Sequence, residues 1–135
     1  MRWKHIGWGL AFIVPIPGAV VRQFTPPACE RCAGHRGVTL QTQPGETVVA
    51  TADGVTEFVG RVGGRLYVVQ RVSPGLRVTY GALGSASVEE GQMVASGETL
   101  GTAGETTYLS VRVGEVHVEP LRALGLGRSR LVPTR

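Results

Sequence analysis

Turn signals recur at roughly ten-residue intervals along this chain, and short runs of valine, threonine and leucine separate them. Each signal contains a glycine, and they lie at residues 43–45, 53–54, 62–64, 73–75, 90–91, 96–97 and 113–114. The body of the chain, residues 20–121, lacks the periodicity of an amphipathic helix. Short strands separated by regularly spaced turns are typical of barrels and sandwiches. The pattern therefore predicts an all-β fold.

The apolar runs between these turns give the expected strands. We place strands at residues 47–52, 55–62, 66–72, 76–80, 93–95 and 108–113. The run at residues 65–71 is the most continuous, and we expect it to form the central strand. The Asp53-Gly54 pair predicts a tight turn, because glycine accepts a positive φ without steric cost.

The length of 135 residues suits one domain with a single core. We assign the β domain to residues 15–124 and a basic, fraying tail to residues 125–135. Residues 1–14 combine a short positive start with an apolar run, as in a signal segment or membrane anchor. The open alternative is that this run forms the first buried strand. The segment favours an exported protein in the cell envelope or outside the cell.

Positive charge is concentrated at the two ends of the chain. Between Val21 and Leu121 there are eight arginines and ten acidic residues, whereas the whole chain has a net charge of +4. A nucleic-acid-binding domain would carry a basic stripe on its folded body. The charge distribution therefore argues against a nucleic-acid partner.

Six segments, in order, resemble the lysostaphin-type (LytM-like) zinc metalloendopeptidases. One of them is Gly-His-Arg-Gly-Val-Thr-Leu at residues 34–40, which is similar to the family's G-H-R-G-V-D-L. The V-x-x-G-x-x-V-x-x-G-x-x-L-G pattern at residues 88–101 also matches closely. The other similar segments lie at residues 17–27, 50–60, 75–80 and 111–121. The resemblance implies a mostly antiparallel sheet in a barrel-sandwich hybrid, and a role on peptidoglycan, where these enzymes cut peptide bonds.

The resemblance also implies a zinc site, and here the chain departs from the family. The family's ligands are the histidine and aspartate of H-x-x-x-D and the second histidine of H-x-H. His35 stands at the first position, but Thr39 replaces the aspartate, and Thr106 and Tyr108 replace the H-x-H pair. Ala82 replaces a further histidine after the strand that ends at Tyr80. A catalytic zinc needs about three protein ligands, so the resemblance implies a degenerate member with a relic groove and no cofactor.

Cys29 and Cys32, which lie six and three residues before His35, leave three interpretations open. They could form a short disulfide, stay free or redox-active, or join His35 in a metal site. We therefore carry three functional hypotheses. The first is a non-catalytic domain that binds peptidoglycan or a cell-wall hydrolase. The second is an active zinc endopeptidase with unusual ligands, and the third is a purely structural envelope domain.

Overall fold

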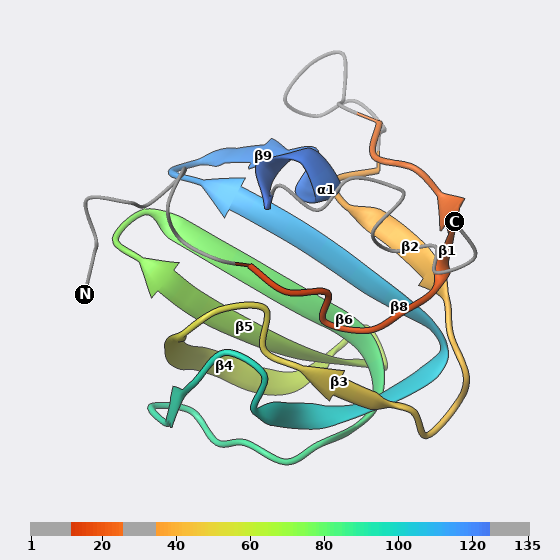
Figure 1. Cartoon of the computed structure of the whole chain (residues 1–135), viewed down its shortest axis with the longest axis horizontal. Coiled ribbons are helices and arrows are strands. Elements are labelled where there is room, and N and C mark those ends of the chain that lie inside the picture. Colours follow the sequence, from red (N-terminus) through yellow and green to blue (C-terminus); the bar gives the residue numbers. More distant parts are fainter. Residues whose placement is uncertain (1–11, 26–34, 125–135) are drawn as a thin grey trace.

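Nine antiparallel strands form one sheet in the computed structural model, which describes residues 12–25 and 35–124 (Figure 1). The main path of the sheet runs β1-β2-β8-β6-β5-β4-β7, while β3 and β9 each pair with β8. The all-β, mostly antiparallel fold is confirmed. The strands are β1 (Ala19–Arg22), β2 (Val38–Gln41), β3 (Thr47–Val49), β4 (Gly54–Val62), β5 (Arg65–Ser73), β6 (Leu76–Ala86), β7 (Met93–Val94), β8 (Thr99–Val113) and β9 (Val116–Val118).

The single helix among the described residues is one short turn, α1 (Pro120–Ala123). Glu119 caps it, because its Oε1 accepts a hydrogen bond from the backbone N–H of Arg122 at 2.7 Å. The part of the chain that the structure describes has no helix with the length and apolarity needed to cross a membrane.

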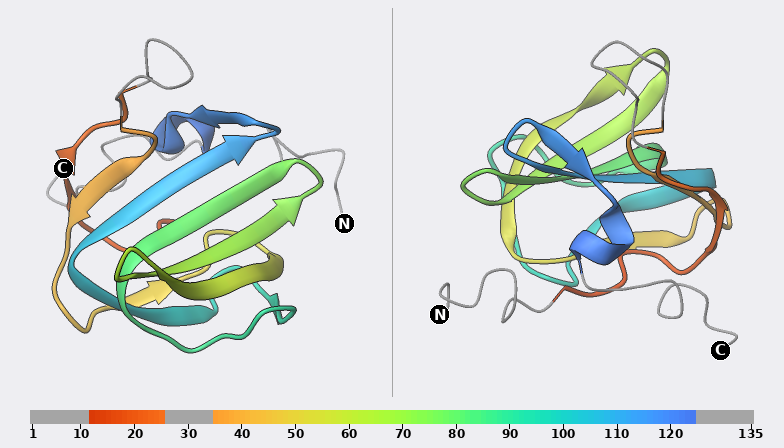
Figure 2. Two further views of the ribbon diagram at one scale, coloured as in Figure 1. Left: turned by 180° about the vertical axis from the view of Figure 1, so that it is seen from behind. Right: turned by 90° about the horizontal axis from the view of Figure 1, so that it is seen from above.

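The β4–β5 hairpin shows how the glycine signals work. Val62 pairs with Arg65, so only Gly63 and Gly64 form the loop, with φ angles of 61° and 84°. Two positive φ angles in a two-residue loop match the right-handed twist of the flanking strands. The hairpin projects to the rear of the molecule (Figure 2, right).

The predicted tight turn at Asp53-Gly54 is wrong. Gly54 does not have a positive φ and already belongs to β4, where it pairs with Val94 of β7. Strand β3, just before this pair, bonds to β8 and not to β4. Asp53 instead holds a different turn, because its Oδ1 accepts a hydrogen bond from the Ser96 N–H at 2.7 Å. The chain therefore crosses between two parts of the sheet here.

The strand expected at the centre of the sheet, residues 65–71, is β5, and it lies one strand away from the centre. The middle of the main path is β6, next to β5, and the longest strand is β8 with 15 residues. Strand β8 pairs with β2, β3, β6 and β9, so it links most of the sheet. The strand expected at residues 108–113 is therefore only the second half of β8.

The sheet has a covered face and an open face. On the covered face, alternate residues of the strands meet the segment around Ile16, strand β3 and α1, which lie in front of the sheet in Figure 1. Its largest fully buried side chains include Tyr80, Ile16, Leu40, Leu100 and Leu109. Seen from behind, strands β2, β8, β6, β5 and β4 lie uncovered by other described elements (Figure 2, left). We call this second surface the open face.

Candidate functional site

Strand pairing places four residues in one row across the open face. Thr39 of β2 lies opposite Tyr108 of β8, and Tyr108 lies opposite Gly81 of β6. Gly81 in turn lies opposite Tyr67 of β5. Directly opposite residues of antiparallel strands point to the same side of the sheet. The neighbouring residues Val38, Leu40 and Leu109 are buried in the core, which assigns the row to the open face.

His35 lies just before β2 and contacts this row. Its backbone is held by two hydrogen bonds to Thr25, in which the N–H and C=O of each residue take part at 2.8 and 2.9 Å. The imidazole Nε2 lies 3.0 Å from Thr39 Oγ1, at hydrogen-bonding distance. The His35 and Tyr108 rings meet edge to face, with centroids 5.6 Å apart. The structure therefore brings His35, Thr39 and Tyr108 together.

A second tyrosine, missed in the sequence, completes the site. The rings of Tyr67 and Tyr108 are also arranged edge to face, 6.4 Å apart. Gly81 makes room for them, since a Cβ at this position would lie 2.6 Å from Tyr67 Cε2. Alternation along β5 places Tyr67, Val69 and Arg71 on one face, which the sequence alone indicates. Only the structure shows that Tyr67 lies opposite Gly81 of β6 and therefore close to Tyr108.

The remaining two predicted positions border the row. Thr106 is two residues before Tyr108 on β8, on the same face, and pairs with Gln41. Ala82 follows Gly81 at a register shift of β6 and has a φ of 59°. A positive φ is uncommon for a residue other than glycine. Ala82 is thus held in a strained backbone conformation beside the aromatic pair.

The pKa values of His35 and Tyr108 are both shifted so that the neutral form is favoured. Burial lowers the pKa of His35, and the nearby positive charge of Arg22 lowers it further. Burial raises the pKa of Tyr108, an effect that its hydrogen bond with Ser110 only partly opposes. At neutral pH His35 and Tyr108 therefore present an imidazole and a phenol without charge, beside the neutral hydroxyl of Thr39.

This set of groups does not fit a zinc ion. Thr39 contributes a neutral hydroxyl, and burial opposes ionisation of the Tyr108 phenol, so neither is a good zinc ligand. Across residues 12–25 and 35–124, no three His, Cys, Asp or Glu side chains are grouped so that they could hold a metal ion. Cys29 and Cys32 lie outside the described residues, so their disulfide, thiol and metal interpretations stay predictions.

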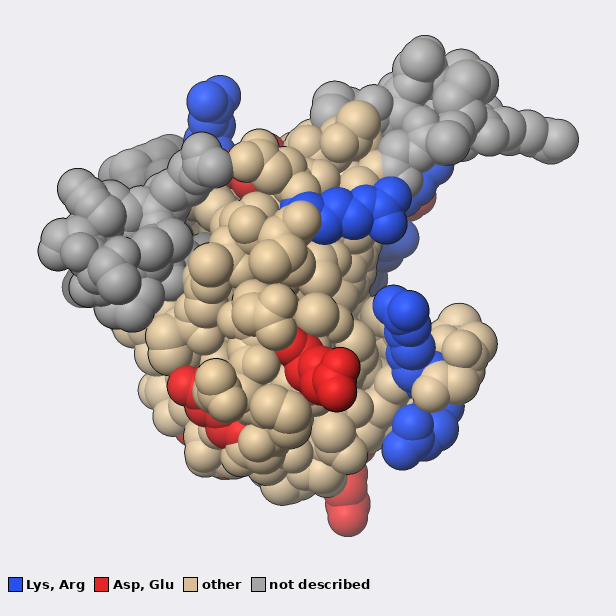
Figure 3. Space-filling view, turned by 90° about the vertical axis from the view of Figure 1, so that its right-hand side faces the viewer, with Lys and Arg blue, Asp and Glu red and all other residues tan. Residues whose placement is uncertain are grey.

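The open face is hollowed. Figure 3 shows the hollow at its right-hand edge, which is the rear of Figure 1, with Lys and Arg side chains above and below it. The projecting β4–β5 hairpin also lies at the rear of the molecule (Figure 2, right). The arrangement can hold a ligand by packing and hydrogen bonding, while metal-assisted hydrolysis has no complete ligand set among the described residues.

Solved structures share this fold. A zinc-containing peptidase from Vibrio cholerae matches with a TM-score of 0.70 and 24% identity, over 84% of this chain and 39% of that one. Lysostaphin matches with a TM-score of 0.62 and 21% identity, over 71% and 44%. The SpoIIQ–SpoIIIAH pore-forming complex gives a TM-score of 0.71 and 17% identity, over 85% and 91%. The fold is thus that of lysostaphin-type peptidase domains.

The sequence comparisons identify the family. Residues 33–122 match the family model of Peptidase family M23. The chain therefore belongs to this family. The uncharacterized protein Rv2891 of Mycobacterium tuberculosis is 36% identical over 98 residues, which are 73% of this chain and 37% of that protein. The uncharacterized protein Mb2915 of Mycobacterium bovis matches equally. The chain thus spans little more than a third of these curated relatives.

Proposed function

We propose that this domain is a non-catalytic member of family M23 that binds peptidoglycan peptide on its open face. The observation that carries the proposal is the contact of His35 with Thr39 and Tyr108. These two side chains stand where the family places metal ligands, and they engage the imidazole directly. A neutral hydroxyl and a phenol cannot replace a carboxylate and an imidazole around zinc.

The aromatic pair gives the site its binding chemistry. Tyr67 and Tyr108 are both half-buried, so each keeps ring surface available to a ligand. Tyrosine combines a large apolar ring with a hydroxyl that can donate or accept a hydrogen bond. A peptide in the hollow could pack its side chains on the rings and bond its backbone to the hydroxyls. Family membership supports a cell-wall peptide as this ligand.

The cell-wall setting also implies export. The apolar run that ends at Val14 supports a signal segment or membrane anchor, as the sequence predicts. Residues 1–11 lie outside the described residues. Residues Phe12 and Val14 pack against the core. We therefore propose an exported domain over residues 15–124.

A protein partner is the second candidate. SpoIIQ, which has this fold, is found in a complex with SpoIIIAH. By analogy, the open face here could receive a cell-wall hydrolase or another envelope protein. Among the hypotheses from the sequence, active cleavage would need ligands outside the described residues. A purely structural role would leave the open face without a ligand.

Sedimentation with purified sacculi tests the proposal. The full chain should pellet with insoluble peptidoglycan without releasing soluble fragments. The Tyr67→Ala and Tyr108→Ala variants should each lose about tenfold in affinity, as expected for aromatic residues at the centre of an interface. Val62→Ala, on the exposed end of β4, is the matched control and should bind like the original chain. Circular dichroism would verify that each variant is folded.

Two results would overturn the proposal. One is release of peptides from the sacculi by the original chain. The other is an absence of binding, or binding that the tyrosine variants leave unchanged. Pelleting only when a cell-wall hydrolase is added would favour the protein-partner candidate.

A further inference from the structure

A row of basic residues crosses the open face parallel to the row of Thr39, Tyr108, Gly81 and Tyr67, which we call the aromatic row. Arg71 of β5 lies opposite Arg77 of β6, and Arg77 lies opposite Arg112 of β8. Arg112 in turn lies opposite His117 of β9. We call these four residues the basic row. His117 is half-buried in this row.

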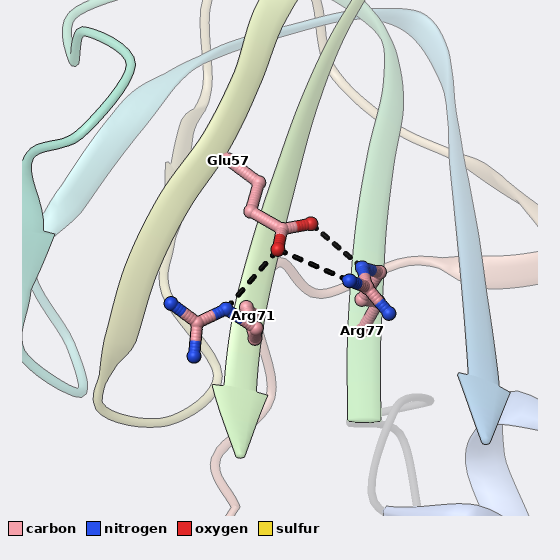
Figure 4. A network of polar contacts seen from close by, with 3 residues as sticks. All are labelled: Glu57, Arg71 and Arg77. Atoms are coloured by element: carbon pink, nitrogen blue, oxygen red, sulfur yellow. Dashed lines mark hydrogen bonds and ion pairs between the residues drawn. The ribbon is translucent and has the colours of Figure 1, made fainter. Parts of the chain in front are cut away.

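Glu57 balances one end of the basic row. It sits at a bulge in β4, where the register shifts between Thr56 and Phe58. Its carboxylate accepts a hydrogen bond from Arg71 Nε at 3.1 Å and two from Arg77, at 2.6 and 3.2 Å (Figure 4). Arg71 thus uses only Nε here, which leaves both terminal nitrogens of its guanidinium for another acceptor.

The other end of the basic row has no such balance. In the described part of the chain, Arg112 forms no ion pair with an acidic side chain. Its cross-strand neighbour on one side is the positively charged Arg77, and on the other side it is His117, whose pKa burial lowers so that its imidazole is neutral at neutral pH. Like charges directly opposite each other destabilise a sheet. An anion bound at this point would remove that repulsion and complete the hydrogen bonding of the guanidinium groups.

We propose that the basic row binds a free carboxylate of the peptide that lies on the aromatic row, an inference that rests on the proposed function. Tyr108 and Arg112 are on the same face of β8 and four residues apart. The two rows are therefore about 13 Å from each other at the usual rise of a strand. That distance is the length of about four extended peptide residues. A short peptide can thus reach both rows at once.

The acidic residues around the basic row favour a single carboxylate over a polyanion. Glu57 lies within the row, and the charge of Glu115 acts on Arg77. The described residues contain eight arginines and nine acidic residues, so the body lacks a strong positive field. A chain of phosphates would meet these carboxylates, whereas one carboxylate fits between them. Arginine binds carboxylates through two parallel hydrogen bonds.

The test uses a peptidoglycan stem pentapeptide with isoglutamine at its second position and lysine at its third, so that the C-terminus is the only carboxylate of the peptide itself, and a fluorescein label that is common to all peptides. Its C-terminally amidated twin is the comparison, and fluorescence anisotropy with the full chain gives both affinities. The free acid should bind at least about fivefold more tightly, as for one charged hydrogen-bonded contact. Arg112→Gln should remove this preference, and Arg112→Lys should keep part of it. Arg65→Gln, on the exposed β4–β5 hairpin, is the control and should change nothing.

The outcomes separate this inference from the proposed function. Equal binding of the two peptides, with dependence on Tyr108, would overturn the basic row alone. Binding of neither peptide would overturn the proposed function and the basic row together. Displacement of the peptide by polyphosphate at concentrations where acetate has no effect would overturn the choice of a carboxylate.

Discussion

His35 is the residue on which the account of the site depends. Its ring is engaged on one side by the Thr39 hydroxyl and on another by the edge-to-face contact with Tyr108. These contacts occupy the space around the imidazole with uncharged groups. If the backbone around them still has the geometry of the family's metal site, changing side chains alone should restore metal binding.

The double variant Thr39→Asp with Tyr108→His tests this idea. Together with His35 it would supply two imidazoles and a carboxylate, the ligand number of a catalytic zinc site. We expect about one zinc ion per chain in the variant, measured by mass spectrometry after dialysis against a zinc buffer. Thr39→Asp alone is the control and should bind zinc weakly. A double variant that is folded and holds no zinc would show that the backbone has diverged.

The histidines also predict how stability depends on pH. The pKa values of His35 and His117 are lowered, mainly by burial, so the folded state disfavours their protonation. The unfolded chain protonates near pH 6.5, and stability should therefore fall as the pH drops from about 7 to 5.5. Thermal unfolding across this range measures the effect. His117→Gln should flatten the dependence, and an unchanged slope would contradict the burial of this ring.

Single residues were predictable from the sequence where a motif fixes their order. His35, Thr39, Thr106 and Tyr108 were selected by their spacing in the resemblance. Thr39 lies on β2, Thr106 and Tyr108 lie on the part of β8 that pairs with β2, and His35 lies just before β2. Tyr67 was missed because its place beside Tyr108 depends on strand register across Gly81. The basic row was missed for the same reason, since its members are distant in sequence.

At the scale of elements, a buried hydrogen-bond network connects strands β5 and β6 to the segment that follows β3. The Tyr80 hydroxyl of β6 donates to Gln70 Oε1 of β5 at 2.6 Å and accepts from the Thr51 N–H at 3.0 Å. Gln70 Nε2 in turn donates to the Ala52 carbonyl at 2.5 Å. This network fixes the segment after β3 against the sheet, which is where the chain changes from one part of the sheet to another.

Removing the hydroxyl from this network should be costly. Tyr80→Phe keeps the ring but leaves the Thr51 N–H and Gln70 Oε1 without their partner. Unsatisfied buried polar groups cost about 1–3 kcal/mol, and we expect a loss of that size in the free energy of unfolding. Urea denaturation measures it, with Thr79→Val on the open face as the control. A loss as small as that of the control would mean that the network contributes little.

Elements were predictable where apolar runs are uninterrupted, and less so where glycines let strands pack closely. Strands β4 and β5 were expected within about two residues of their observed ends. The first half of β8 was missed, because Gly101 and Gly104 interrupt its apolar pattern. These glycines allow close strand contact, since a Cβ on Gly101 would lie only 2.0 Å from the Ser85 carbonyl oxygen. The Asp53-Gly54 prediction was wrong because a side-chain bond to Ser96, distant in sequence, decides that turn.

At the scale of the whole molecule, charge balance predicts weak binding to nucleic acid. The described residues carry nine acidic side chains against eight arginines, so few phosphates could be neutralised together. We expect no retardation of a 30-base-pair duplex by the full chain in 150 mM salt. Tight binding that weakens steeply with salt would contradict this expectation.

The zinc content of the purified full chain tests the central claim most directly. Expressed and purified under reducing conditions, supplied with zinc and dialysed, the protein should hold much less than one zinc per chain by mass spectrometry. It should also leave purified sacculi intact under the same conditions. One tightly bound zinc per chain, together with cleavage of the sacculi, would contradict the account of a domain that keeps the family's fold without its chemistry.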